Sequence, residues 1–305
     1  MNRRWLFFIS CTLLVNQQIS AFNWQKGLLY ALAFGGASAF TTDHRRTPLR
    51  MQVKKMALLK EQNTDLKALV EILEQYVFEK TQKRVVVVFM PNGVAEVVQG
   101  TVSDELYLVL GTENGWGLLW DELGAFLLQE KNGEMPAQSE RIALAKAIIG
   151  HECQHVNHND GKTINIIGVL GSVMAGLHWS YRMENGEPWY QNMLHASWQN
   201  FLASVVVVTG LCAYCRFFEH RADREASNNA DENRALATWL INQVYRGYME
   251  KMPTELKDLC KKHAWLEDLM VFQMDPIHPH PLTRAAYLNE KAAMLEKAKA
   301  QAAAA

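Results

Sequence analysis

The segment SERIALAKAIIGHECQHVNHND, residues 139–160, limits most strongly how this chain can fold. It follows a proline and has Glu140 in its first turn, both of which are typical of a helix start. Gly161 comes directly after it and is a helix stop signal. These signals predict one helix, which fixes the directions of the two histidines and the glutamate that it carries.

His151 and His155 are one helical turn apart, so both imidazoles project from the same face and can reach one ion at the distance that zinc needs. Glu152 is rotated by about 100° from His151. It can therefore face a metal-bound water as a general base instead of binding the metal. This is the arrangement behind the pattern HExxH. The alternative interpretation is that both histidines are ordinary buried residues.

A catalytic zinc needs a third protein ligand and an open fourth position. The segment FEHRADREA supplies Glu219 on a predicted helix, and Asp223 follows one turn later on the same face. Asp223 is therefore placed to orient a ligand imidazole from outside the metal ligands. We expect one Zn²⁺ per chain, held by His151, His155 and Glu219.

A third motif, HPHPLTR at residues 278–284, follows HExxH and ExxxD. This order resembles the family-48 zinc metallopeptidases, the HExxH gluzincin group of HtpX and the CAAX prenyl endopeptidase, over roughly residues 65–290. The resemblance implies that His278 either donates to the oxyanion or occupies the fourth metal position, with Arg284 just outside the ligands. His280 is the alternative to His278.

This chain departs from the pattern of that family at two places. Where the family often has a histidine nine residues after the first histidine of HExxH, this chain has Asp160. The family also often has a glycine-rich edge strand before the active helix, along which substrate docks. Here that region has the sequence NGVAEVVQGTVSDELYLVLG.

The rest of the folded part is predicted to be mainly α-helical with a small β-sheet, an α+β fold. Residues 51–80 place leucines and other apolar residues at helical spacing, which predicts one or two amphipathic helices. Residues 84–90 and 105–111 are rich in β-branched and apolar residues and predict strands, with VAEVVQG between them. We expect a zincin-like metallopeptidase domain over residues 51–298.

Two regions are unusually apolar. Residues 1–42 contain two apolar runs after Arg3 and Arg4, which fit either a cleaved signal peptide or an N-terminal membrane hairpin. Residues 163–218 form a second apolar hairpin, inserted between the two helices that carry the metal ligands. Aromatic residues at the ends of its two runs suit a membrane interface. Two buried helices beside a loop are the alternative.

Charge gives a prediction about partners and location. A formal net charge of −1 gives no overall attraction to nucleic acid, so we expect no nucleic-acid partner. Lys162 and Arg224 flank the second hairpin on the metal side, whereas its connecting loop has only Arg182. If the hairpins span a membrane, this distribution of basic residues predicts a bacterial inner-membrane protein with a cytoplasmic active site. Signal-peptide cleavage would instead place the domain in the periplasm.

Together these features predict a membrane-associated zinc metalloendopeptidase that acts on a protein or peptide substrate, in protein quality control or processing. Glu152 would deprotonate the water that attacks the scissile carbonyl. One alternative is a zinc-binding chaperone or adaptor on the same fold, although an intact Glu152 argues against it. Another is a helical membrane scaffold in which HExxH is accidental.

Overall fold

The computed structural model describes residues 47–91, 95–99, 105–184 and 210–304. The chain divides into two compact units, one formed by Met1–Thr42 with Asn165–Val208 and the other by Asp43–Ile164 with Thr209–Ala305. The predicted signal peptide or hairpin at residues 1–42 lies outside the described residues. So does most of the second run of the predicted hairpin at 163–218.

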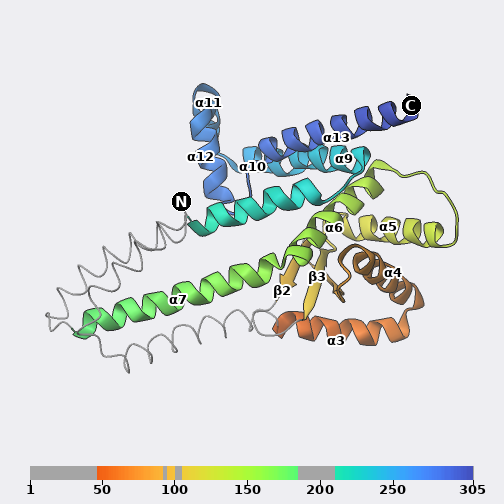
Figure 1. The fold of residues 1–305 in the computed structure, drawn as a ribbon, viewed down its shortest axis with the longest axis horizontal. Coiled ribbons are helices and arrows are strands. Elements are labelled where there is room, and N and C mark those ends of the chain that lie inside the picture. Colours follow the sequence, from red (N-terminus) through yellow and green to blue (C-terminus); the bar gives the residue numbers. More distant parts are fainter. Residues whose placement is uncertain (1–46, 92–94, 100–104, 185–209, 305) are drawn as a thin grey trace. The chain divides into compact units, whose positions relative to one another are not determined.

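Helices make up most of the described part, and one small sheet completes it (Figure 1). The predicted mainly α-helical fold with a small β-sheet is thereby confirmed. The elements are α3 (Thr47–Gln62), α4 (Thr64–Thr81), β1 (Val86–Met90), β2 (Ala95–Gln99), β3 (Leu106–Gly111), α5 (Trp116–Lys131), α6 (Glu140–His158), α7 (Asp160–Glu184), a helix at residues 210–225, α9 (Ala230–Trp239), the π-helix η2 (Leu240–Tyr245), α10 (Arg246–Lys251), α11 (Thr254–Lys262), α12 (Ala264–Met274) and α13 (Pro281–Ala304).

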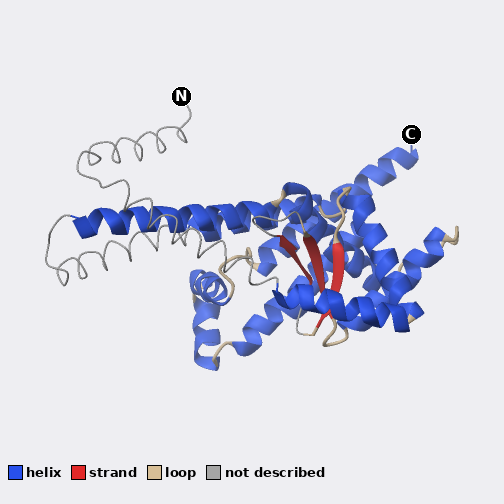
Figure 2. Ribbon diagram, turned by 90° about the horizontal axis from the view of Figure 1, so that it is seen from below, coloured by secondary structure: helices blue, strands red, loops and turns tan. Residues whose placement is uncertain are grey.

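The three strands lie side by side in one small sheet (Figure 2). Their order is β1-β3-β2, so β3 is the central strand, and all six of its residues are buried. β1 runs parallel to β3, with Val88 opposite Val109. β2 pairs antiparallel with β3, with Val97 opposite Leu108. Because β2 has a neighbour on one side only, its other edge keeps backbone groups available for side chains or for another strand.

The helix α6 occupies the centre of its unit and contacts α4, α5, α9 and β2 (Figure 1). Ser139 caps its first turn by accepting a hydrogen bond from the Ile142 amide at 3.2 Å. Ala145, Ile149 and Cys153 are fully buried against the hydrophobic core. The HExxH segment thus starts on a rigid, well-packed helix.

The predicted helix end at Gly161 is wrong. α6 ends at His158, Asn159 adopts a left-handed conformation with φ 55° and ψ 38°, and α7 starts at Asp160. Asparagine tolerates this conformation better than most residues, so it can redirect the chain without a glycine. Gly161 has a different role, because a Cβ there would lie 3.1 Å from the Cβ of Gln99.

No helix within the described residues is both long enough and apolar enough to cross a membrane.

Candidate metal centre

Three of the predicted site residues bring ligand atoms together at one point. His151 Nε2 and His155 Nε2 are 3.2 Å apart. Glu219, from the helix at residues 210–225, places Oε2 3.2 Å from His151 Nε2 and Oε1 3.3 Å from His155 Nε2. All three side chains are largely buried. Among the described residues, they form a group of potential metal ligands.

These separations match the coordination sphere of a small metal ion. Ligands about 2.0–2.1 Å from a tetrahedral centre lie about 3.3 Å from one another. In addition, Glu219 Oε2 is buried and accepts no hydrogen bond from the described residues. Arg284 Nη1 lies 3.6 Å from this oxygen, which is too long for a hydrogen bond, and a buried carboxylate oxygen that accepts no hydrogen bond is costly unless a closer cation satisfies it. The three side chains therefore fit a zinc ion in both spacing and donor type.

A carboxylate–arginine pair lies behind His151. Its Nδ1 is 2.9 Å from Asp223 Oδ1, although the ring is not well aligned for a hydrogen bond. Arg284 donates to both Asp223 oxygens, at 2.6 and 2.7 Å. Asp223 is completely buried, so its charge depends on this bidentate partner. The structure thus places Asp223 and Arg284 next to the cluster, as the sequence predicts.

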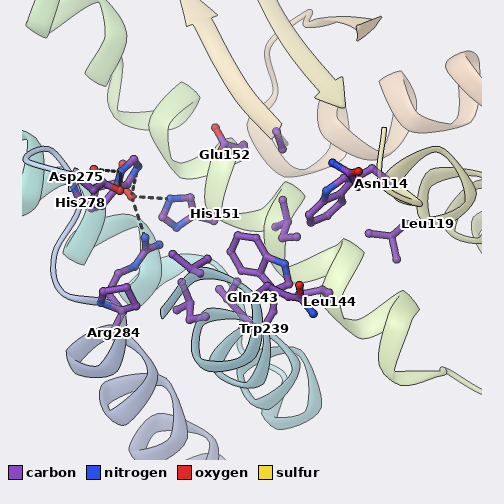
Figure 3. A pocket seen from close by; sticks show the side chains of 18 of the residues that line it. Asn114, Leu119, Leu144, His151, Glu152, Trp239, Gln243, Asp275, His278 and Arg284 are labelled. Atoms are coloured by element: carbon purple, nitrogen blue, oxygen red, sulfur yellow. Dashed lines mark hydrogen bonds and ion pairs between the residues drawn. The ribbon is translucent and has the colours of Figure 1, made fainter. Parts of the chain in front are cut away.

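The base candidate Glu152 lies beside the cluster and faces the edge strand (Figure 3). Its Oε2 accepts a hydrogen bond from the Val97 amide of β2 at 3.0 Å. Because β2 pairs with β3 on its other side, this amide projects from the free edge of the sheet. Burial raises the pKa of Glu152, and the nearby imidazoles oppose that effect. A carboxylate with a raised pKa is a better proton acceptor than an ordinary glutamate.

His278 reaches the same cluster from the loop before α13. Its Nε2 lies 3.7 Å from Glu219 Oε2, and its Nδ1 is 2.8 Å from Asp275 Oδ1. Tyr248 donates a second hydrogen bond to Asp275 at 2.6 Å. His280 lies elsewhere, with Nε2 3.8 Å from Glu267. Of the two histidines left open by the sequence, His278 is therefore the one beside the cluster.

The charges around the cluster favour a cation at its centre. Burial lowers the pKa of His151 and His155, but the adjacent carboxylates outweigh it and raise these values to about 9 and about 10. Burial likewise raises the pKa of Glu219, yet His151 and the other nearby cations hold it well below the usual range. The surrounding carboxylates thus create a field in which positive charge is stabilised.

A cavity of about 960 Å³ extends from the cluster between α5, α6, α9 and η2. His151, His278 and Arg284 lie at one end of it and Asn114 at the other (Figure 3). Between them the wall is largely apolar, with Trp116, Leu119, Leu144, Ile148, Trp239 and Leu240. A π-helix is rare and often marks a functional site, and here η2 supplies Leu240 and other lining residues.

Comparison with known proteins agrees with this geometry. The sequence model of peptidase family M48 matches residues 127–292, which is just over half of the chain. The chain belongs to peptidase family M48. It is thus a member of a metallopeptidase family, and the matched region contains every predicted site residue. Neither the curated proteins nor the solved structures gave a match.

Two further residues lie beside His155, because Asp160 Oδ2 is 2.9 Å from His155 Nδ1 and Arg221 donates a hydrogen bond to Asp160. Sequence reasoning did not identify these two residues or Tyr248 and Asp275 as part of the site. Asp275 could have been found, since an acidic residue three positions before His278 can reach its ring. Tyr248 and Arg221 gave no signal, because nothing in their spacing links them to the motifs. Asp160 was seen only as a departure from the family pattern, because its position depends on the turn at Asn159.

Proposed function

We propose that this M48 peptidase is a zinc metalloendopeptidase whose ion is held by His151, His155 and Glu219. The observation that carries the proposal is the spacing of these three donors, 3.2–3.3 Å between facing atoms, together with a buried Glu219 oxygen that accepts no hydrogen bond from the described residues. Both histidines and the glutamate are common zinc ligands, and three protein ligands leave a position open for catalysis. One zinc ion at this cluster is expected per chain, since the part of the chain that the structure describes brings together one such group of ligands.

Zinc bound at this cluster would polarise a peptide carbonyl and lower the pKa of a coordinated water. Glu152 lies within the same cavity and accepts the proton from the attacking water. It then delivers that proton to the leaving amine, which completes cleavage of the peptide bond. His278, with Nδ1 bonded to Asp275, presents its other nitrogen to the cluster and donates a hydrogen bond to the developing oxyanion.

The substrate is proposed to be an extended protein or peptide segment that lies along the edge of β2. Edge strands pair readily with extended chains, and Ala95 of β2 lines the cavity beside Glu152. Such a segment would direct one side chain into the apolar cavity, whose walls include Trp116 and Trp239. These indole rings are in edge contact, with centroids 5.8 Å apart. The cavity volume and its apolar walls suit a large apolar side chain.

Membrane association and a cytoplasmic active site are also part of the proposal. They are supported by the sequence alone, through the apolar runs at residues 1–42 and 163–218 and the basic residues that flank them. Protein quality control or processing would suit a peptidase in this position. Protection of the Lys162 region from protease added outside spheroplasts is the expected result. Release of a soluble form that begins near Phe22 or Phe40 would show export instead.

The decisive test replaces Glu152 with glutamine. Glu152→Gln keeps the size of the side chain but removes the base, so zinc content should stay near one ion per chain while peptide cleavage is lost. Zinc is measured by elemental analysis, and cleavage by mass spectrometry on a mixed peptide library. Glu225→Gln is the matched control, because Glu225 pairs with the exposed ring of His158 and is not among the cavity-lining residues.

Three outcomes separate the hypotheses. Full cleavage by Glu152→Gln would refute the assigned role of the base. Zinc binding without cleavage by the wild-type protein would favour the chaperone or adaptor alternative. A wild-type protein that binds no zinc would refute the proposed metal centre.

A further inference from the structure

His155 has its own buried carboxylate, supplied by a residue just beyond the end of α6. Asp160 Oδ2 lies 2.9 Å from His155 Nδ1. The Asp160 side chain is only 3% exposed, and its Oδ1 accepts a short hydrogen bond from Arg221. The Arg221 guanidinium also lies over the ring of Phe218, 5.0 Å from its centroid. Asp160 is thus fixed between an imidazole and an arginine.

This contact exists only because the chain turns sharply at Asn159. In a continuous helix, five residues correspond to a rotation of about 140°, so Asp160 would point away from His155. The left-handed conformation of Asn159 ends α6 and brings Asp160 back toward the imidazole. Lys83 holds the turn by donating to Val156 O at 2.6 Å and to Asn159 Oδ1 at 2.9 Å. Gln99 also donates to Asn159 Oδ1, at 3.3 Å.

We propose that Asp160 is a positioning residue that sets the tautomer and the ring orientation of His155. A carboxylate at Nδ1 keeps the proton on that nitrogen and leaves the lone pair of Nε2 free. Nε2 is the atom that faces His151 and Glu219. Arg221 holds the Asp160 carboxylate in place by donating a hydrogen bond to its other oxygen. The inference rests on the proposed zinc centre, because its purpose is to prepare His155 as a ligand.

The pairing of a carboxylate with an arginine beside His155 resembles the pairing beside His151. There Asp223 faces Nδ1 and Arg284 binds Asp223. Each histidine of HExxH therefore has a carboxylate behind it, and each carboxylate has an arginine. The two carboxylates come from different elements, Asp160 from the start of α7 and Asp223 from the helix at residues 210–225, so each imidazole has its own carboxylate.

The test measures metal binding in Asp160→Asn, Asp160→Ala and the control Glu225→Gln. Zinc affinity is determined by competition with a chromophoric chelator, well below the unfolding temperature. Both Asp160 variants should bind zinc about 10- to 100-fold more weakly, as is typical when the partner of a ligand histidine is removed. At saturating Co²⁺, their visible absorption bands should differ from those of the wild type. Glu225→Gln should match the wild type in both measurements.

Removal of Asp160 alone leaves Arg221 without its partner, which could impair folding. The double variant Asp160→Asn/Arg221→Gln removes both charges and avoids this problem. It should fold and should still show the weakened zinc affinity and the altered cobalt spectrum.

Unchanged zinc affinity and an unchanged cobalt spectrum in Asp160→Asn, Asp160→Ala and the double variant would overturn the inference and leave the zinc centre intact. A lower unfolding temperature alone would show that Asp160 is merely structural, which also overturns it. If the wild-type protein binds neither zinc nor cobalt, the proposed function and this inference both fail.

Discussion

Gly150→Ala offers a severe test of how the metal centre is built, because this glycine lies where two ligand-bearing helices approach each other. α6 carries Gly150 directly before His151, and a Cβ at Gly150 would lie only 2.4 Å from the backbone oxygen of Ala226. Ala226 directly follows the helix at residues 210–225, which carries Glu219. The added methyl group would therefore push apart the two segments that meet at the cluster.

The size of the effect follows from the distance. Ordinary van der Waals contact begins at 3.4 Å, so the two segments must separate by about 1 Å. Overpacking of this kind costs about 1–3 kcal/mol. Alanine regains about 1 kcal/mol of helix propensity over glycine. We expect a net loss of about 0–2 kcal/mol in the free energy of unfolding.

The effect on zinc binding should exceed the effect on folding. Zinc sites tolerate ligand displacements of only about 0.2 Å, and His151 and Glu219 lie on the two sides of the strained contact. We therefore expect zinc affinity to fall by at least about tenfold in Gly150→Ala. Urea unfolding of the metal-free protein and chelator competition measure the two effects separately.

Gly247→Ala in α10 is the matched control, since a Cβ there meets nothing within 4 Å. It should gain up to about 1 kcal/mol of stability with unchanged zinc affinity. The reasoning is refuted if Gly150→Ala behaves like this control. That result would mean that the backbone at Ala226 can move away without displacing Glu219.

Further predictions address individual groups. Glu219→Ala should lose most bound zinc in elemental analysis, and wild-type zinc content would contradict its role as a ligand. His278→Ala should lower turnover by about 10²–10³-fold if it donates to the oxyanion, whereas a rise in peptide cleavage would indicate an inhibitory fourth ligand. Burial raises the pKa of the Cys153 thiol to about 12, so iodoacetamide at about pH 8 should label it only after unfolding, as peptide mapping will show. Burial raises the pKa of Asp275, but hydrogen bonds from His278 and Tyr248 outweigh it and hold the pKa at about 2. The stabilisation that ionised Asp275 contributes should therefore be fully present above about pH 5 and fall as the pH drops toward 2, with about 1 kcal/mol lost between pH 5 and pH 3. Urea titration of the metal-free protein should show a weaker acid dependence in Asp275→Asn, and equal slopes would refute this assignment.

Local patterns in the sequence predicted the fold class and several individual elements correctly. The β-branched residues after Arg84 predicted β1, because β-branched side chains favour the extended conformation. The helical spacing of the leucines before Thr81 predicted α4. Helical spacing was also sufficient to place His151 and His155 together. It predicted their shared direction because one turn separates them.

Features that depend on distant contacts were not predictable. The pairing order of the sheet places β2 at an edge, and nothing in its five residues specifies that position. The π-helix η2 has the sequence LINQVY, in which no residue type marks its wider turn. Tyr248 contacts Asp275 across 27 positions, and no local spacing predicts a contact of that kind.

Asp160 shows how one residue in a left-handed conformation can bring together two side chains that a continuous helix would keep apart. On the sequence, a carboxylate five residues after His155 lies on the wrong side of a helix, and Gly161 is the more obvious place for that helix to end. The turn at Asn159 comes two residues earlier, and it is stabilised by Lys83 and by Gln99 from the end of β2. Gln99 also accepts a hydrogen bond from the Lys162 amide at 3.2 Å, so the edge strand contacts the first turn of α7. The strand proposed to bind the substrate therefore also supports the turn that places a carboxylate behind His155. A change at Gln99 would then disturb metal binding through the turn at Asn159, although Gln99 itself is no ligand.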